Sequence, residues 1–142
     1  MTGNIENLRK WFRDCPALAR NNRFGVDFMS EDEEQYGLYS MPSNINYRDN
    51  VLGESVPADV QSVNFVFAAR LPYGNDIEQN MINLGFHQDV TNWIIEQNAK
   101  QNFPTINEGR VTAISVTLTQ YPATVGAQTA IYQIQIKLTY RR

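Results

Sequence analysis

The sequence predicts an α+β fold of two layers, a mostly antiparallel sheet with helices packed on one face. Three observations predict it. Apolar residues recur at helical spacing near the N-terminus and again within residues 75–101. Residues 60–71 and 130–140 instead alternate apolar and polar side chains, as strands with one buried face do. Turn-like segments join consecutive strands, which favours antiparallel pairing and leaves one apolar face for the helices to cover.

The N-terminal third is expected to hold a helix and a hairpin. The apolar face of a helix over residues 3–14 comprises Ile5, Leu8, Trp11 and Phe12. Pro16 follows, where a helix should stop. Residues 24–29 and 36–41 are predicted strands, and the polar turn of residues 30–35 between them predicts a hairpin.

Residues 42–59 have the least regular pattern in the chain, with two prolines, a glycine and three asparagines. We expect a long loop here with a short strand around Ile45 and Tyr47. Loops of this length in compact domains are usually functional or mobile. The long strand predicted over residues 60–71 has a buried face that comprises Val63, Phe65, Phe67, Ala69 and Leu71.

The longest helical pattern, residues 75–101, carries two apolar stripes. Asp76 and Gln79 have the spacing of a capping box at a helix start. The first stripe comprises Ile77, Met81 and Leu84, and the second comprises Phe86, Val90, Trp93 and Ile94. At about 100° per residue, the two stripes lie on opposite sides of a straight helix. We therefore predict a break near Gly85, which would turn both stripes towards the sheet.

The C-terminal third predicts a second hairpin. Residues 111–121 form one strand, with Ile114, Val116 and Leu118 on its buried face. Residues 122–128 are expected to turn into the last strand, whose alternation should fix the register of pairing. The outward faces of both strands carry Thr, Gln and Ser in place of most charges, which suits either a subunit contact or an ordinary polar surface.

Composition limits the classes of function. The 142 residues fit one α+β domain that spans residues 1–142. No apolar run approaches the roughly 18 residues of a membrane span, and the N-terminus lacks the apolar centre of a signal peptide. The chain is therefore expected to stay in the cytosol where it is made. The lone Cys15 excludes an internal disulfide, and Cys15 with the single His87 offers too few ligands for a zinc site. We expect no metal and no cofactor.

Charge is distributed unevenly along the chain. Residues 1–23 carry a net charge of +3, residues 24–59 carry −7 and residues 111–142 carry +3, within a total of −3. An acidic middle and basic ends could dock against other copies of the chain. The acidic run of residues 31–34 also suits a solvated turn.

Enzyme signatures are missing, since the sequence has no phosphate-binding glycine loop, nucleophile elbow or metalloprotease motif. Cys15 and His87 could form a nucleophile pair, because basic neighbours can lower the pKa of a thiol. A cysteine before a proline at a helix end is more often a small apolar filler, and His87 is expected at a helix end or on the surface. Aromatic residues follow the apolar phase of the elements and do not alternate with Lys and Arg, which disfavours nucleic-acid binding.

A series of short motifs resembles a known family. The motifs are Ile5-x-x-Leu8-x-x-Trp11-Phe12-x-x-Cys15-Pro16-x-Leu18, Val26-Asp27-Phe28, Tyr39-Ser40-Met41-Pro42, Phe65-x-Phe67-Ala68-x-Arg70, Tyr73-Gly74-x-Asp76-x-x-Gln79-Asn80, Trp93-Ile94-x-x-Gln97-Asn98, Phe103-Pro104 and Thr129-Ala130-x-Tyr132-Gln133-Ile134. In this order they look like the small minor capsid or tail-completion proteins of tailed phages and prophages of Gram-positive bacteria. The resemblance covers nearly the whole chain. It departs in residues 42–59, which are longer than the family's usual connection.

The resemblance implies a non-enzymatic virion protein similar to tail terminators, which close the end of the tail tube as a ring, commonly a hexamer. Its partners would be tail-tube and head-connector proteins, with no membrane and no specific nucleic acid. It would assemble in the host cytoplasm and reside in the virion, at the tail or the head–tail junction. A ring needs heterologous contacts. The expected assembly contacts are Glu31, Asp32, Glu33, Glu34, Arg48, Asp49, Glu54, Arg141 and Arg142.

Two other classes of function remain open. One is a small-molecule-binding or enzymatic α+β domain of a cytosolic oligomer, which a deep pocket containing His87 or Cys15 would support. The other is a different structural subunit of the same particle, such as a capsid stopper, a connector or a tail-tube subunit.

Overall fold

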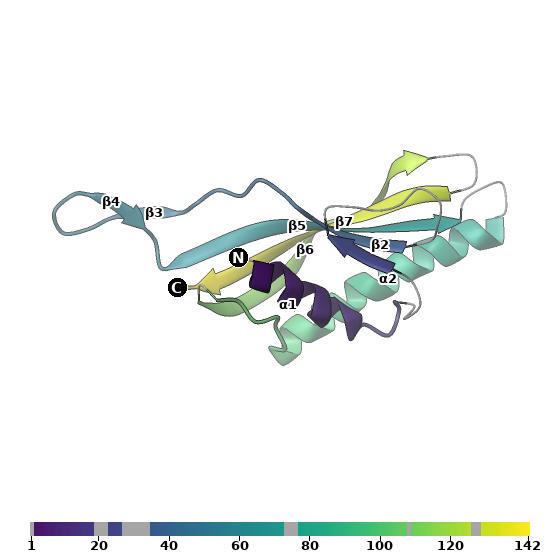
Figure 1. The fold of residues 1–142 in the computed structure, drawn as a ribbon, viewed down its shortest axis with the longest axis horizontal. Helices are drawn as coiled ribbons and strands as arrows, with labels where there is room; N and C mark the ends of the chain where they lie inside the picture. The colour runs from purple at the N-terminus through teal and green to yellow at the C-terminus, as the bar shows by residue number, and fades with distance from the viewer. Residues whose placement is uncertain (1, 19–22, 27–34, 73–76, 108, 126–128) are drawn as a thin grey trace.

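The computed structural model describes residues 2–18, 23–26, 35–72, 77–107, 109–125 and 129–142. In chain order the elements are α1 (Thr2–Arg13), β1 (Arg23–Val26), β2 (Gln35–Ser40), β3 (Tyr47–Asp49), β4 (Ser55–Pro57), β5 (Val60–Pro72), α2 (Ile77–Lys100), β6 (Arg110–Val125) and β7 (Thr129–Arg141). One sheet has the order β1-β2-β5-β7-β6, and β3 pairs with β4 in a separate small sheet. Both helices lie on one face of the large sheet (Figure 1), which confirms the predicted two-layer α+β fold.

The core is an aromatic cluster between the helices and the centre of the sheet. The apolar face of α1 is buried as predicted, and the ring of Phe12 stacks on that of Phe67 in β5 with centroids 5.2 Å apart. Phe67 also contacts the rings of Phe24 in β1 and Tyr36 in β2. The buried side chains of β7 include Ile134, Ile136 and Leu138, as its alternation predicted. A single contiguous core therefore joins the two layers.

The predicted hairpin of β1 and β2 is wrong, because these two strands pair in parallel. Phe24 lies opposite Tyr36, and Val26 lies opposite Leu38. β2 then pairs antiparallel with β5, as expected. The eight residues between β1 and β2 can span about 26 Å, which is enough chain to return along a four-residue strand of about 13 Å. The polar composition of that connection therefore did not require a tight turn.

Strand β6 differs from its prediction at two places, the face on which Leu118 lies and the position of Pro122. Its register against β7 shifts between Val116 and Leu118, so that Val116 pairs with Ile136 on the buried face while Leu118 pairs with Gln135 on the outer face. Leu118 is consequently exposed, and its predicted burial is wrong. The strand also continues through Pro122, where a turn was predicted. β6 is an edge strand, where a residue without an N–H is tolerated.

Helix α2 continues without interruption through Gly85, so the predicted break is wrong. Gly85 is not among the described residues with positive φ. Glycine inside a helix costs only about 1 kcal/mol relative to alanine, which the packing of the second stripe can offset. Val90 and Ile94 are buried against the sheet, whereas Ile77, Met81 and Leu84 of the first stripe are exposed. The capping residue Asp76 lies outside the described residues.

Candidate assembly surfaces

Residues 45–58, which we call the arm, form an ordered β-hairpin at one end of the molecule. Strands β3 and β4 pair antiparallel, with Arg48 opposite Val56. In Figure 1 the arm projects from the start of β5, away from both helices. The sequence predicted a loop with a short strand here, and the structure replaces it with a two-stranded hairpin outside the main sheet.

The arm is held at its tip by Asn50 and Gly53. The side-chain oxygen of Asn50 accepts hydrogen bonds from the backbone N–H groups of Leu52 and Glu54, at 2.9 and 3.0 Å. Gly53 adopts a φ of 79°, a left-handed conformation that glycine reaches without strain. These residue types therefore close the turn between β3 and β4.

Gln61, at the start of β5, holds the base of the arm. Its side-chain oxygen accepts a hydrogen bond from the backbone N–H of Asn46, and its amide donates to the carbonyls of Asn46 and Ala58 at 2.8 and 2.9 Å. The side chain is buried, so these bonds form away from water. Gln61 of the main sheet is thereby hydrogen-bonded to the residues at both ends of the arm.

The arm exposes apolar side chains that no described residue covers. Val51 and Leu52 stand at its tip, and Ile45 and Tyr47 lie along its length, all of them exposed. A solvated turn would place polar residues at these positions. The apolar pair Val51 and Leu52 between Asn50 and Gly53 could have indicated a contact surface from the sequence, but it was not among the predicted contacts.

The structure brings part of the predicted set of contact residues together. Arg48, Asp49 and Glu54 are exposed on the arm. Arg141 and Arg142 are exposed beside its base, where Arg141 pairs with Val60 and the N–H of Arg142 donates to the carbonyl of Asp59 at 2.8 Å. The remaining predicted contacts lie outside the described residues: Glu31, Asp32, Glu33 and Glu34.

A third arginine, which the sequence reasoning missed, completes a basic group at the base of the arm. Arg110 in β6 is exposed and pairs with Arg141 across the edge of the sheet. Arg110, Arg141 and Arg142 thus share one end of the hairpin of β6 and β7. Residues 31 positions apart in the chain meet there because the two strands run antiparallel.

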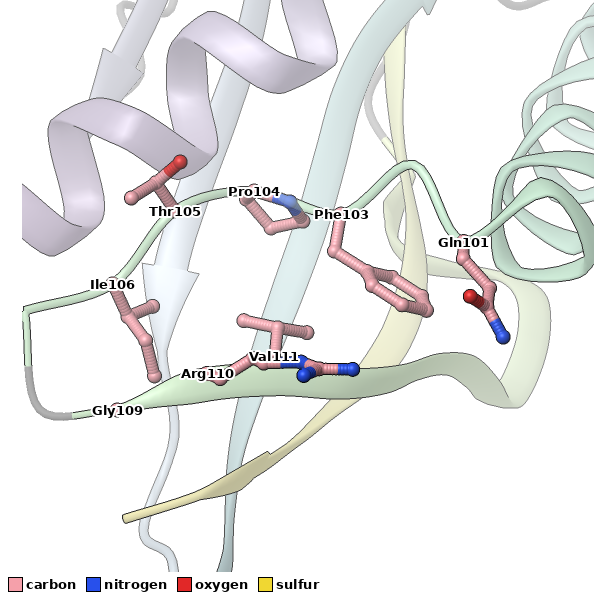
Figure 2. Close-up of a pocket in the computed structure, with 8 residues that line it drawn as sticks. All are labelled: Gln101, Phe103, Pro104, Thr105, Ile106, Gly109, Arg110 and Val111. Carbon is pink, nitrogen blue, oxygen red and sulfur yellow. The ribbon is translucent and has the colours of Figure 1, made fainter.

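A shallow recess lies between the segment after α2 and the start of β6. Figure 2 shows Phe103 and Ile106 on one side and Val111 on the other, with Arg110 at the rim. The recess holds about 320 Å³ and is open to solvent. Neither His87 nor Cys15 lines it or the two neighbouring recesses.

Several residues of the motifs that carry the family resemblance lie beside this recess, where α1, the end of α2 and the segment after α2 meet. The indole N–H of Trp11 donates to the carbonyl of Asn102 at 2.9 Å, and its ring contacts that of Trp93 at 4.5 Å between centroids. Asn102 donates to the side chain of Gln97 at 2.6 Å. The side chain of Asn98 accepts from the N–H of Ile114 in β6. These residues hold the scaffold together.

The outer face of the large sheet is nearly uncharged across its centre. One row of paired positions crosses four strands and comprises Tyr39, Val66, Gln135 and Leu118. Val66 is buried within this face, and Leu118 at its edge is exposed. The bulge in β6 therefore adds an apolar side chain to a face that the sequence predicted to be polar.

Cys15 and His87 are both buried in the core. Burial raises the pKa of the Cys15 thiol, and the negative charge of Asp89 adds to this, against backbone hydrogen bonds at Ala17 and Leu18 that lower it. The raised pKa argues against the alternative of an activated thiol, and the burial of Cys15 fits the interpretation of a small apolar filler. His87, expected at a helix end or the surface, instead lies fully buried inside α2.

The buried ring of His87 has one good hydrogen bond. Nδ1 lies 3.2 Å from the carbonyl oxygen of Asn83, which can only accept, so the Nδ1–H tautomer donates to it. Nε2 has no hydrogen-bond partner among the described residues, although the ring lies 5.3 Å from that of Tyr132. A neutral ring fits these surroundings, because a charged ring would lose its hydration on burial without gaining a partner for its second N–H.

Acid is expected to weaken the fold through His87. Burial lowers the pKa of His87 below its ordinary 6.5, and the backbones of Asn83 and Tyr132 offset this in part. Below about pH 6.5 the unfolded chain binds a proton that the folded chain does not. The free energy of unfolding should therefore fall with pH from about 6.5 down to the lower folded-state pKa.

Denaturant unfolding between about pH 7.5 and 5.5 checks this, because His87 is the only histidine. The variant His87→Gln should lack that part of the pH dependence. An unchanged slope in the variant would contradict the assignment.

Among the described residues, no helix is long and apolar enough to cross a membrane. The same residues contain no group of three or more His, Cys, Asp or Glu side chains placed to hold a metal ion. Comparison with models of known protein families and with curated proteins gives no match for this sequence.

Proposed function

We propose that this chain is a structural subunit of a tailed-phage virion that acts as a tail-terminator or tail-completion protein and forms a ring at the head–tail joint. The observation that carries the proposal is the arm, an ordered hairpin that presents Val51 and Leu52 to solvent at the end of the molecule. Exposed apolar groups on a rigid projection favour contact with another protein.

The surfaces of the chain support the proposal in two further ways. Arg110, Arg141 and Arg142 add positive charge at the base of the arm, which suits orientation of an acidic neighbour. The outer sheet face offers a second contact area that is poor in charge, as interface cores are. Several different surfaces on one chain suit a ring subunit, which contacts neighbours on two sides and partners above and below.

Mass measurement of the purified protein over a range of concentrations tests this proposal, followed by negative-stain imaging. The expected result is a closed ring, commonly of six copies, that binds isolated tail tubes at one end. A protein that stays monomeric at every concentration and does not associate with tail-tube subunits would refute the proposal. Spontaneous polymerisation into long tubes would instead favour the alternative of a tail-tube subunit.

A further inference from the structure

The first half of helix α2, residues 77–87, buries polar residues and exposes apolar ones, which is the reverse of what a helix serving only one core would do. Asn83 and His87 are buried against the sheet. On the exposed side, Ile77 is 74% exposed and Met81 is 63% exposed. An amphipathic helix that covers one sheet carries its apolar residues on the buried side. The inversion indicates that α2 has a second contact.

Four of the exposed apolar residues of α2 lie along one side of the helix and form what we call the α2 stripe: Ile77, Met81, Leu84 and Ile95. The spacings of four, three and eleven residues place them along one line of the helix surface. Ile82 is also exposed but lies off this line. Most of the stripe belongs to the first two turns of α2.

The arm and the α2 stripe lie at opposite ends of the molecule. The arm precedes Val60, the first residue of β5, and α2 begins five residues after Pro72, the last. Twelve steps of strand separate these ends by about 40 Å. Figure 1 shows the arm and the start of α2 at the two ends of the long axis. The arm therefore cannot cover the stripe within one chain, but it can reach the stripe of a second copy placed head to tail.

Charge favours this pairing over a pairing of two α2 stripes. The exposed surface beside the stripe carries the acidic residues Glu78 and Asp89. Two such helices facing each other would bring like charges together. On the arm, Arg48 and Val56 share one face because they are paired residues of β3 and β4, and Arg48 is exposed. That face offers a cation and an apolar side chain to an acidic and apolar helix.

The combined area also fits a contact between two copies. A fully exposed aliphatic side chain presents roughly 100 Å² of apolar surface. The arm and the α2 stripe together hold on the order of 500 Å² of it, and each alone holds about half. A small specific interface buries about 1,200 Å² in total, of which somewhat more than half is apolar. The two surfaces together supply most of that apolar share, and the charge pattern distinguishes their pairing from a contact between two stripes.

We propose that the arm of one copy docks on the α2 stripe of the next, with Val51 and Leu52 against Met81 and Leu84. This inference rests on the proposed ring and names the contact that closes it. The contact is heterologous, since a different surface is used on each partner, and such contacts generate rings when the rotation closes. Arg48 lies beside Asp89 of the neighbouring copy and sets the orientation.

Cross-linking tests the contact directly. The double variant Leu52→Cys with Met81→Cys should form disulfides between copies under mild oxidation and give a ladder of covalent multimers that ends at the ring size. Each single variant should stay monomeric on a denaturing gel. The wild-type chain is a matched control, because its own Cys15 is buried. A ladder from Met81→Cys alone would show α2 against α2, and one from Leu52→Cys alone would show arm against arm; either overturns the proposal.

A second measurement separates this inference from the proposed function. The variant Leu52→Ser should raise the concentration needed for assembly at least tenfold and leave the melting temperature unchanged at concentrations where both proteins are monomeric. Ile82→Ser also removes an exposed aliphatic side chain, but Ile82 lies about 100° round the helix from Met81, outside the α2 stripe, so this variant should leave assembly unchanged. Rings that form equally well with Leu52→Ser would overturn the docking contact and leave the ring standing. A wild-type protein that never leaves the monomeric state would overturn both.

Discussion

Replacing Phe67 by alanine is expected to lower the free energy of unfolding by about 3–5 kcal/mol, the range measured for buried phenylalanine. Phe67 is fully buried in β5, and its ring contacts those of Phe12, Phe24 and Tyr36. These three partners come from α1, β1 and β2, so the cavity left by Phe67→Ala would open between both layers. The structure cannot easily relax to fill this cavity, because side chains on several elements would have to move together.

Denaturant unfolding of Phe67→Ala and of Phe65→Ala checks this prediction. Phe65 lies two residues earlier on the same face of β5 but is only half-buried. Its truncation should therefore cost clearly less than that of Phe67. Equal losses in the two variants would show that the aromatic cluster around Phe67 is not the centre of the core.

Replacing Gly109 by alanine is expected to destabilise the fold by about 1–3 kcal/mol, as overpacking does. A Cβ added at Gly109 would overlap the carbonyl oxygen of Arg141 and lie 2.9 Å from its carbonyl carbon. Both atoms belong to the backbone of β7, so no side chain can rotate away. The start of β6 or the end of β7 would have to move, and Arg110 and Arg141 at the base of the arm would move with it.

Gly85→Ala is the matched control for Gly109→Ala, and its effect should have the opposite sign. A Cβ at Gly85 meets no atom within 4 Å, and the residue lies inside the continuous helix α2. Alanine there should stabilise the protein by about 0.5–1 kcal/mol. Thermal unfolding of both variants measures the difference, and a destabilised Gly85→Ala would contradict the unbroken helix.

The sequence by itself determined the elements whose apolar pattern has one period and one buried face. The residues of α1 that recur at helical spacing, Leu8, Trp11 and Phe12, are buried as predicted. The same holds for β7, where Ile134, Ile136 and Leu138 alternate with outward residues. Local periodicity is sufficient to predict the buried residues of these elements, because all of their apolar side chains pack against the same core.

The long helical pattern of residues 75–101 was predicted as helical but misinterpreted in its geometry. The prediction assumed that all apolar residues must reach the one core, which required a break at Gly85. In the structure α2 is continuous and Met81 remains outside, while the polar residues Asn83 and His87 go inside. A sequence pattern shows that two apolar stripes exist, but it does not show that each serves a different contact.

Among the candidate contacts, Arg48, Arg141 and Arg142 were predicted from the sequence because of their charge alone. The sequence did not show that Arg110 and Arg141 would meet at the base of the arm, because register between distant strands brings them together. It also missed Leu52, since an apolar residue in a loop has no period from which a role could be inferred.

Only the tertiary structure decided the direction of β1, the face of Leu118 and the exposure of the α2 stripe. β1 is parallel to β2, an arrangement that a connection of eight residues permits and that composition does not reveal. Leu118 faces outward because a bulge shifts the register against β7 by one residue. The stripe is exposed because the sheet accepts only one side of a straight helix. Each outcome depends on non-local geometry, whereas the pattern of a sequence reports only local preference.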